Sequence, residues 1–390
     1  MVHQYDPTQV AQVGGVEMFI NTFAKHAPED IELRIVGITA NEREHRVGRW
    51  QPISFGGRRV EFLPVLAAQP GRGPGLPLSA KLAWALMRSR RRLELDNAVL
   101  TFHRIEPSLP ARALGVPSVL ILHSHSKDHY NAQTEKGWRK APRLYEWLEA
   151  RLIGGVKRIF MVRQDAVADY CRRYPRLAPR IQFLPTVLDD EIFVSWSEAR
   201  RAEQRRRLAA EHGLDPARPW LLFVGRFEAA KDPMLALEAV RDLPPASAQL
   251  VMLGRGTLER EMRDYIARHA LEAQVRLIGA QPQSQLVRWL NAADGLCMSS
   301  AFEGMPLAML EALHCGLPVV STAAGGETPR ILQPPAGLVV AERSASALAR
   351  AIRKLLSRAP DRAACRAAAA PYAARTALAP LYQQYREIAQ

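Results

Sequence analysis

Two carboxylates flank a turn that leads into an apolar helix late in the chain. Glu303 stands before the turn residues Gly304 and Pro306, and Glu311 follows it after seven intervening residues. From Leu307 onward, apolar residues recur at three- and four-residue spacing, which is typical of a helix. The start of a helix offers unpaired N–H groups and a positive dipole end, so it favours an anion. This pattern could hold a phosphate, with one carboxylate near a sugar and the other on a ribose.

Two cations stand between a buried strand and a helix earlier in the chain. Residues 219–224 predict the strand, Arg226 and Lys231 follow it across a glycine turn, and the next helix begins near Pro233. Arginine grips phosphate through two parallel hydrogen bonds, and lysine adds a point charge. The alternative is a pair of exposed loop cations. Their place before a helix N-terminus favours a diphosphate site instead.

Three histidines end two predicted strands in the first half of the chain. Residues 97–103 predict a strand that ends at His103, and residues 116–125 predict another that ends with His123 and His125. Strands that alternate with helices imply a parallel sheet, in which the carboxyl ends of the strands share one edge. His-x-His also occurs in metal sites, but no further ligands stand near it, so we expect no metal there.

A glycine pair precedes the first predicted helix. Gly14 and Gly15 are followed by an amphipathic stretch that carries Val16, Phe19 and Phe23 on one face. The backbone N–H groups of such a turn can approach a phosphate closely. A Gly-Gly turn is common, so it indicates a phosphate site only together with other motifs.

The length and composition indicate a globular protein of two domains. The chain has 390 residues, more than one compact core accommodates, and 48% of them are hydrophobic and 24% charged. No apolar run approaches the length of a membrane span, and the first residues do not resemble a signal peptide, so we expect a cytoplasmic protein. The four cysteines lie far apart, which is typical of reduced core residues.

The net charge of +14 calls for an anionic partner or another physical reason. Basic runs occupy residues 88–92, 136–143 and 200–207. The third run predicts a solvated helix face, on which Glu203 and Arg207 can pair across one turn. The first two runs could form a surface that faces an anionic membrane. Nucleic acid ranks lower, because no nucleic-acid motif accompanies these runs.

The ordered string Phe-Glu-Gly-Met-Pro-Leu at 302–307, Leu-Glu-Ala at 310–312 and Gly-Leu-Pro-Val-Val at 316–320 carries a resemblance to a known family. With the Gly-Arg…Lys motif at 225–231, it resembles the retaining GT-B glycosyltransferases of family four, the glycosyl transferases of group 1. The resemblance implies an α/β protein with two doubly wound, Rossmann-like domains facing a cleft. The expected acceptor-side domain covers residues 1–190 and the terminal helix 372–390, and the nucleotide-sugar domain covers residues 191–371.

The resemblance also implies site residues. Glu303 would lie by the donor sugar and diphosphate, Glu311 would bind the ribose hydroxyls, and Arg226 and Lys231 would hold the diphosphate. A histidine after the strand at 116–122 would sit beside the donor sugar, and His123 fits this place best, with His125 as its rival. The implied catalytic residues are therefore Glu303, His123, Arg226 and Lys231. The implied donor-binding residues are Gly14, Gly15, His125, Arg226, Lys231, Glu303, Gly304, Met305, Pro306, Leu307 and Glu311.

The expected activity is hexosyl transfer with retention from a nucleotide diphosphate sugar, UDP- or GDP-linked, without a cofactor or an obligatory metal. The expected acceptor is a polyprenyl-diphosphate-linked saccharide of cell-surface or exopolysaccharide assembly, handled at the inner face of the cell membrane. One alternative is a degenerate GT-B scaffold that binds a membrane or a polyanion. A second is a Rossmann oxidoreductase, but the Gly-x-Gly at 254–256 lacks the rest of the dinucleotide fingerprint.

Overall fold

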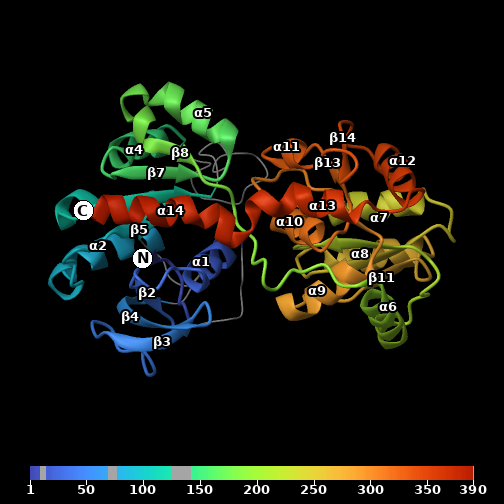
Figure 1. The fold of residues 1–390 in the computed structure, drawn as a ribbon, viewed down its shortest axis with the longest axis horizontal. Helices are drawn as coiled ribbons and strands as arrows, with labels where there is room; N and C mark the ends of the chain where they lie inside the picture. The colour runs from blue at the N-terminus through green and yellow to red at the C-terminus, as the bar shows by residue number, and fades with distance from the viewer. Residues whose placement is uncertain (9–14, 69–76, 124–141, 390) are drawn as a thin grey trace. The chain divides into compact units, whose positions relative to one another are not determined.

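The computed structural model describes residues 1–8, 15–68, 77–123 and 142–389 (Figure 1). Two compact units divide the chain: residues 1–187 with 374–390, and residues 188–373. The division expected from the sequence lay at 190/191 and 371/372. Gly14 and His125, and most of the basic run at 136–143, lie outside the described residues.

An eight-stranded sheet forms the centre of the first unit, in the order β3-β4-β2-β1-β5-β6-β7-β8. All of its neighbouring strands are parallel except the antiparallel pair β3 and β4. The strands are β1 (Val2–His3), β2 (Arg34–Thr39), β3 (Gln51–Phe55), β4 (Arg58–Ala67), β5 (Leu100–Phe102), β6 (Ser118–Leu122), β7 (Arg158–Met161) and β8 (Ile181–Phe183).

The antiparallel pair is a hairpin that our reading of the sequence did not include. Gly56 and Gly57 join β3 to β4, with φ angles of 58° and 73°. A two-residue turn with positive φ at both positions matches the twist of the flanking strands, and glycine adopts it without steric cost. The Gly-Gly pair between two runs of alternating apolar residues was therefore the available sequence signal.

Helices cover the sheet of the first unit: α1 (Gly15–Lys25), α2 (Leu78–Arg88), α3 (Ala111–Leu114), α4 (Pro142–Ile153), α5 (Gln164–Arg173) and α14 (Ala374–Ala389). Short 3-10 turns are η1 (Arg90–Arg92), η2 (Glu106–Ser108) and η5 (Pro175–Arg180). The basic run at 88–92 thus spans the last residue of α2, Ser89 and η1. The last helix, α14, packs in a core cluster with α1, where the Tyr382 hydroxyl donates to the Phe23 carbonyl at 2.7 Å.

A six-stranded, wholly parallel sheet forms the centre of the second unit, in the order β11-β10-β9-β12-β13-β14. Its strands are β9 (Trp220–Val224), β10 (Gln249–Leu253), β11 (Val275–Leu277), β12 (Gly295–Met298), β13 (Val319–Thr322) and β14 (Gly337–Val340). They are short apolar runs, and β9, β10, β12 and β13 are buried almost throughout. That pattern is typical of a parallel sheet covered on both faces.

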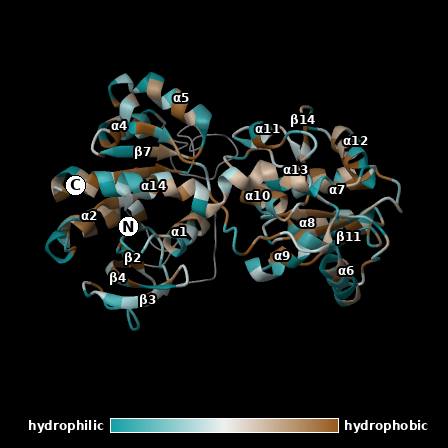
Figure 2. Ribbon diagram, in the orientation of Figure 1, coloured by the Kyte–Doolittle hydropathy of each residue, from teal (hydrophilic) through white to brown (hydrophobic). Residues whose placement is uncertain are grey.

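The helices of the second unit are α6 (Glu198–His212), α7 (Pro233–Arg241), α8 (Glu259–Arg268), α9 (Gln283–Ala292), α10 (Leu307–His314), α11 (Thr328–Ile331), α12 (Ala345–Leu356) and α13 (Arg362–Ala369), with the 3-10 turn η6 (Ala370–Tyr372). Their hydropathy can be followed in Figure 2. Ser197 caps the start of α6, and Gly213 ends it with φ of 64°. The predicted pair of Glu203 and Arg207 on α6 is confirmed.

The strand order places a crevice in each unit. In the second unit, β9 and β12 are neighbours although the chain leaves them toward opposite edges of the sheet. In the first unit, β1 and β5 are related in the same way. Ligands of doubly wound sheets bind outside the carboxyl ends of the strands at such a switch point. The residues that follow β9 and β12 are therefore the candidate ligand-binding residues of the second unit, and those that follow β1 and β5 are the candidates of the first unit.

Candidate active site

A buried carboxylate lies at the switch point of the second unit. Glu303 follows β12 and is 6% exposed. Its Oε1 accepts from Lys231 Nζ at 2.5 Å and from the Ser300 hydroxyl at 2.6 Å. Lys231 comes from the loop after β9, so the sheet brings the two predicted residues together. Burial of a charged carboxylate is costly unless it is paired and hydrogen-bonded, and these two partners meet that requirement.

Hydrogen bonds join the loops after β9 and β12. The Ala301 N–H donates to the Ala230 carbonyl at 3.0 Å. The Ser299 hydroxyl donates to the carbonyl of Asp232 at 2.6 Å, and the Asp232 side chain in turn accepts from the Leu235 N–H at the start of α7. Each of these contacts involves a backbone group, so together they fix the backbone conformation of the two loops. The loops in turn position the ion pair of Lys231 and Glu303.

A third loop, after β13, closes around the same turn. The Glu303 N–H donates to the Ala324 carbonyl at 2.9 Å, and the Glu327 N–H donates to the Gly304 carbonyl at 3.2 Å. Gly326 lies so close to this turn that a Cβ on it would stand 2.0 Å from the Gly304 oxygen. Its φ of 60° adds a second reason for glycine. The Gly-Gly pair at 325–326 therefore supports the loop that carries Glu303.

The remaining predicted cation, Arg226, is exposed at the first turn after β9. The backbone beside it is held by the Phe227 N–H, which donates to the Arg255 carbonyl at 2.9 Å. An exposed guanidinium on a fixed backbone can reach a phosphate at little cost in desolvation. Arg226 thus differs from Lys231, whose ammonium group is already engaged by Glu303.

Helix α10 begins directly after the turn that carries Glu303. Pro306 precedes its first residue, Leu307, and no side chain caps its first N–H groups. Met305 and Pro306 are buried, whereas Gly304 and Leu307 are partly exposed. Unsatisfied N–H groups at a helix start, next to a lysine, favour a bound anion.

The second predicted glutamate lies inside α10. Glu311 is 3% exposed, and burial raises the pKa of its carboxyl group from 4.5 to about 8. The group is therefore mostly protonated at neutral pH in the free protein. A ligand that donates hydrogen bonds to it would favour the ionised form, because such bonds stabilise the carboxylate.

Histidines occupy the corresponding edge of the first unit. His103 follows β5 and His123 follows β6, and their rings stack with centroids 5.3 Å apart. Nδ1 of His103 and Nε2 of His123 are 3.0 Å apart and share a hydrogen bond. Burial lowers the pKa of both imidazoles, that of His123 to about 4, so both are neutral at pH 7.

These histidines line a cavity at the carboxyl ends of β1, β5 and β6. His3, which ends β1, lies in its wall with His103 and His123. The other lining residues are Val2, Gln4, Tyr5, Val16, Glu17, Ile20, Leu82, Arg104, Ile105, Glu106, Pro107, Leu122 and Tyr145. Nine of the lining residues are apolar or aromatic and seven are polar or charged, and small-molecule sites likewise combine apolar walls with polar groups. Gly15, another predicted site residue of this unit, is exposed at the start of α1.

Sequence reasoning missed the partners of the predicted residues. Ser300 supports Glu303, and His103 pairs with His123. His103 had a usable signal, because it ends a strand next to the strand that His123 ends. Ser300 had none beyond its place at the end of β12, since a hydroxyl contact depends on the path of the loop.

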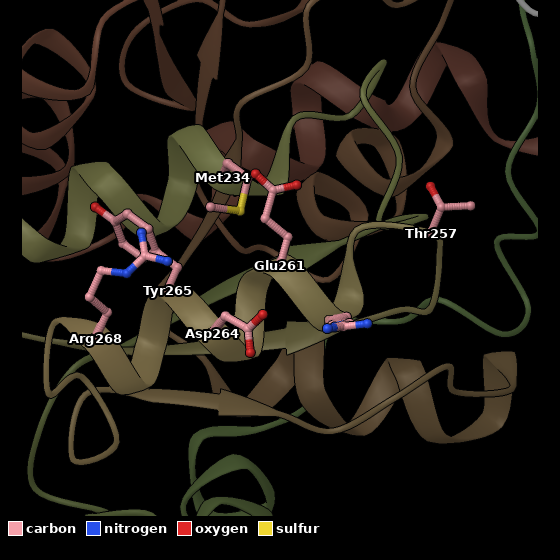
Figure 3. A pocket seen from close by; sticks show the side chains of 7 residues that line it. Met234, Thr257, Glu261, Asp264, Tyr265 and Arg268 are labelled. Atoms are coloured by element: carbon pink, nitrogen blue, oxygen red, sulfur yellow. The ribbon is translucent and has the colours of Figure 1, made fainter.

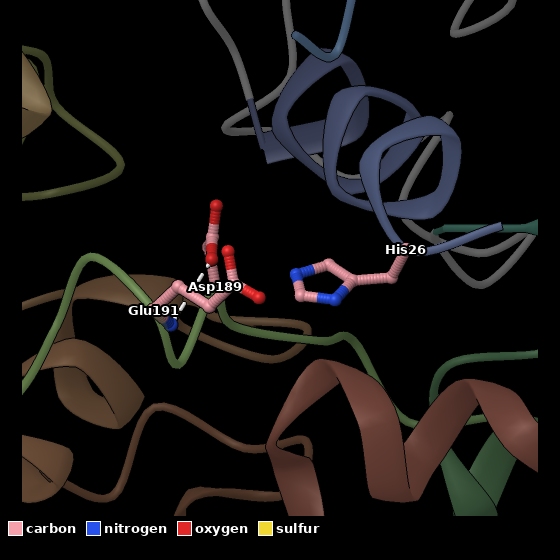
Figure 4. Close-up of side chains that lie close together, drawn as sticks. All are labelled: His26, Asp189 and Glu191. Carbon is pink, nitrogen blue, oxygen red and sulfur yellow. Dashed lines mark hydrogen bonds between the residues drawn. The ribbon is translucent and has the colours of Figure 1, made fainter. Parts of the chain in front are cut away.

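A surface hollow and a set of potential metal ligands are not assigned to the active site. A hollow beside α8 is lined by Met234, Thr257, Arg260, Glu261, Asp264, Tyr265 and Arg268, and it contains no predicted site residue (Figure 3). Figure 4 draws three potential metal ligands, His26, Asp189 and Glu191, and the hydrogen bond that the Glu191 N–H donates to Asp189 Oδ1 at 3.2 Å. His26 belongs to the first unit and the two carboxylates to the second. Metal independence therefore stays a prediction.

The segment that matches a known protein family lies in the second unit, which contains Glu303. Residues 204–371 match the model of the glycosyl transferases group 1 family. These residues belong to the glycosyl transferases group 1 family. The resemblance drawn from the glutamate helix and the Gly-Arg…Lys motif is thereby confirmed.

Glycosyltransferases are also found among the curated relatives. The chain is 31% identical over 232 residues to the D-inositol 3-phosphate glycosyltransferase of Pseudarthrobacter chlorophenolicus, covering 58% of the chain and 53% of that protein. It is 34% identical over 143 residues to the amylovoran biosynthesis glycosyltransferase AmsK of Erwinia amylovora, covering 35% of each. The chain thus spans about half the length or less of these two relatives.

Solved structures show the fold of the whole chain. The Anabaena protein Alr3699/HepE in complex with UDP and glucose superposes with a TM-score of 0.71 at 17% identity, covering 99% of this chain and 98% of that one. WaaG, a glycosyltransferase involved in lipopolysaccharide biosynthesis, superposes with a TM-score of 0.62 at 19% identity, covering 100% and 97%. The predicted GT-B fold is confirmed. Among the described residues, no helix has the length and apolar character needed to span a bilayer.

Proposed function

We propose that the chain is a hexosyltransferase that transfers a hexose from a nucleotide diphosphate sugar, with retention of configuration. The observation that carries this proposal is the group formed by Lys231, Glu303 and Ser300 at the start of α10, with Arg226 exposed on the neighbouring loop. These residues lie within the matched segment 204–371. They supply cations for a diphosphate and a carboxylate for a sugar.

The chemistry requires one bond to break and one to form at the same carbon. The bond between the anomeric carbon and the diphosphate oxygen breaks, and its electron pair leaves with the nucleoside diphosphate. The acceptor hydroxyl oxygen bonds to that carbon on the same face, and its proton passes to the departing phosphate. Arg226, Lys231 and the N–H groups of α10 stabilise the charge on the leaving group. Glu303 offsets the positive charge that develops on the sugar.

This arrangement needs no divalent metal to neutralise the diphosphate, so we propose metal-independent transfer. Lys231 is paired with Glu303 before the donor binds, and a diphosphate would compete for its ammonium group. Glu311 would accept hydrogen bonds from the ribose hydroxyls. The relative solved with UDP and glucose makes a uridine nucleotide the first donor to test.

The proposed acceptor is a polyprenyl-diphosphate-linked saccharide at an anionic membrane surface. Four large apolar side chains of the first unit are more than half exposed: Trp84 (65%), Leu109 (60%), Leu144 (55%) and Trp147 (57%). They come from α2, α4 and the end of η2, and both helices contact η2. We call these four residues the aromatic face. Exposed apolar patches of this kind mark interaction surfaces.

Arginines accompany the tryptophans of the aromatic face. The Arg88 guanidinium lies 5.4 Å from the ring centroid of Trp84, and the Arg151 guanidinium lies 5.4 Å from that of Trp147. Arg90, Arg91 and Arg92 follow α2 directly. Tryptophan with arginine suits the interface of an anionic bilayer, where the ring enters the headgroup layer and the cation meets phosphate. WaaG, which is described as involved in lipopolysaccharide biosynthesis, supports an acceptor of this class.

Transfer of labelled hexose from UDP- and GDP-sugars to a polyprenyl-diphosphate-linked saccharide, in EDTA, tests the proposed activity. We expect one donor to serve, and Glu303→Gln and Lys231→Met to lower kcat by about a hundredfold or more. The control Lys354→Met changes an exposed lysine on α12. NMR of the product linkage tests retention. Absence of transfer with every donor would favour the degenerate scaffold.

Flotation with phosphatidylglycerol-containing vesicles and with neutral vesicles tests the aromatic face. We expect binding to the anionic vesicles, and its loss in the double variant Trp84→Ala, Trp147→Ala. The control is Trp196→Ala, since Trp196 carries Arg200 3.9 Å above its ring but belongs to the second unit. Equal binding by both variants would contradict the role of the aromatic face.

A further inference from the structure

The stacked histidines at the cavity of the first unit form a hydrogen bond whose direction the structure constrains. Nδ1 of His103 and Nε2 of His123 are 3.0 Å apart, and Phe19 lies edge-on to both rings. Both imidazoles are neutral at pH 7, because burial lowers their pKa values. Each ring therefore carries one proton, and one ring must donate while the other accepts.

The other nitrogen of His103 decides which ring donates. His103 is 8% exposed, and its Nε2 is buried with no hydrogen-bond partner among the described residues. Among buried backbone groups, an N–H without an acceptor is rarer than a carbonyl without a donor, and we apply the same preference to the imidazole nitrogens. The favoured tautomer of His103 therefore leaves Nε2 bare and carries the proton on Nδ1. Nδ1–H then donates to Nε2 of His123, so the proton of His123 must sit on its Nδ1.

We infer that His103 is a positioning residue that fixes His123 as the Nδ1–H tautomer, so that His123 offers the substrate a hydrogen-bond donor. The acceptor of that bond is an oxygen of the hexose, a hydroxyl or ring oxygen. His123 cannot then serve as a general base, since its only lone pair is taken by His103. This inference rests on the proposed hexosyl transfer and deepens it, because it assigns the role of His123 to binding an oxygen.

The neighbours of the pair agree with this assignment. His3 lies in the same cavity wall, and its Nδ1 is 2.7 Å from the Tyr5 carbonyl, which can only accept. His3 therefore keeps its own proton on Nδ1 as well. Among the described residues, the charged and titratable groups around the pair are His3, Tyr5, Glu17, Arg104, Glu106 and Tyr145 of the cavity wall and the amino group of Met1, while Asp6 acts on His3.

Nitrogen-15 NMR of the full chain, labelled at histidine, tests the tautomer directly. The shifts of Nδ1 and Nε2 distinguish a protonated from a bare ring nitrogen, and the spectrum of His123→Asn assigns the signals. We expect His123 to show a protonated Nδ1 and a bare Nε2 between pH 6 and 8. A protonated Nε2 on His123 would overturn the inference, whatever the activity of the protein.

Two substitutions of His103 test the consequence for transfer. In His103→Asn the amide nitrogen can donate in place of Nδ1, so we expect the His123 tautomer and kcat/KM to stay within a few-fold of wild type. In His103→Asp the carboxylate can only accept, so the proton of His123 moves to Nε2 and kcat falls about tenfold or more. Activity of His103→Asp should recover on acidification, because an imidazolium again carries a proton on Nδ1.

The outcomes separate this inference from the proposed function. Equal kcat and equal pH profiles for His103→Asn and His103→Asp, with wild-type NMR as expected, would overturn the role in transfer while leaving hexosyl transfer intact. Absence of transfer in the wild type with every donor would overturn the proposed function, and with it the role of His123 toward a hexose. If His103→Asp does not fold, the wild-type spectrum and His103→Asn still decide the tautomer.

Discussion

At the scale of single residues, the site combines a carboxylate that has two side-chain partners and a buried carboxyl group whose pKa is raised. Glu303 is paired with Lys231 and Ser300, whereas Glu311 is buried in α10 with a raised pKa. The difference follows from their environments rather than from their chemistry. A paired carboxylate is ready to face a positive charge, whereas a buried carboxyl group ionises at neutral pH more readily when a ligand donates hydrogen bonds to it.

The proposed contact of Glu311 with the ribose predicts that the affinity for a sugar nucleotide depends on pH. Ribose hydroxyls would bind the ionised carboxylate, and the free group has a pKa of about 8. We therefore expect the affinity for a UDP- or GDP-sugar to rise by up to about tenfold per pH unit below pH 8 and then to level off. Calorimetric titration between pH 6 and 9 checks this, and the diester phosphates of the ligand do not titrate in that range. A flat profile would contradict the ribose role.

The raised pKa of Glu311 also predicts that the free energy of unfolding falls as the pH rises, whereas the affinity for the ligand rises. The pKa of Glu311 is raised from 4.5 to about 8 on folding, so the stability it contributes is present at low pH and lost as the pH rises through that window. Glu311→Gln should thus unfold at a higher temperature than wild type at pH 8, and at a similar temperature at pH 5. The control is Glu342→Gln, at an exposed position. Its unfolding temperature should stay close to that of wild type at both pH values.

The residue types at the site could be predicted from the sequence, but their partners could not. Glu303, Glu311, Arg226 and Lys231 stand in short motifs with fixed places relative to strands and helices. The contacts of Ser300 and His103 arise between segments that are distant in sequence or depend on the exact path of a loop. Such contacts follow from packing, which spacing does not encode.

At the scale of elements, the site depends on how three loops fit together. The strands after which they emerge, β9, β12 and β13, were recognisable as short apolar runs. The hairpin of β3 and β4 was missed, although its Gly56-Gly57 turn was a usable signal. The strand expected at 97–103 is shorter in the structure, where β5 runs from Leu100 to Phe102, because strand ends are set by pairing rather than by periodicity.

The glycine pair after β13 provides a matched test of the loop packing. Gly325 and Gly326 both have positive φ, 78° and 60°. A Cβ on Gly325 meets nothing within 4 Å, whereas one on Gly326 would meet the Gly304 oxygen. We expect Gly325→Ala to cost only the backbone strain, about 1–2 kcal/mol, and Gly326→Ala to cost more and to weaken donor binding. Thermal unfolding and nucleotide titration of both variants check this, and equal losses would contradict the close packing.

At the scale of the whole molecule, the chain forms two α/β units, and its last helix returns to the first. Helix α14 buries Leu378, Leu381, Tyr382, Tyr385 and Ile388 against the first unit. The Tyr385 hydroxyl is 2.8 Å from the Thr101 hydroxyl on β5. This return was expected from the family resemblance, since the apolar spacing near the C-terminus predicts a helix but not the unit that it covers.

Removal of α14 should unfold the first unit selectively. Each large apolar side chain that it buries is worth about 1.5–3 kcal/mol, so its five largest together match the whole stability of a typical domain. We expect a chain ending at residue 373 to lose one calorimetric transition and to keep the transition of residues 188–373. The milder Tyr382→Phe should cost about 1 kcal/mol through the bond to the Phe23 carbonyl. Retention of both transitions after truncation would contradict the packing role.

The central claim is that cations and helix N–H groups of the second unit bind the diphosphate of a sugar nucleotide without a metal. Thermal unfolding with UDP, GDP, ADP and their sugars, in EDTA and in Mg²⁺, tests it most directly, because a ligand of the native state raises the unfolding temperature. We predict a shift with one base that is the same in EDTA and in Mg²⁺, and that is reduced in Arg226→Ala but kept in the control Arg353→Ala. No shift with any nucleotide, or a shift that requires Mg²⁺, would contradict the account.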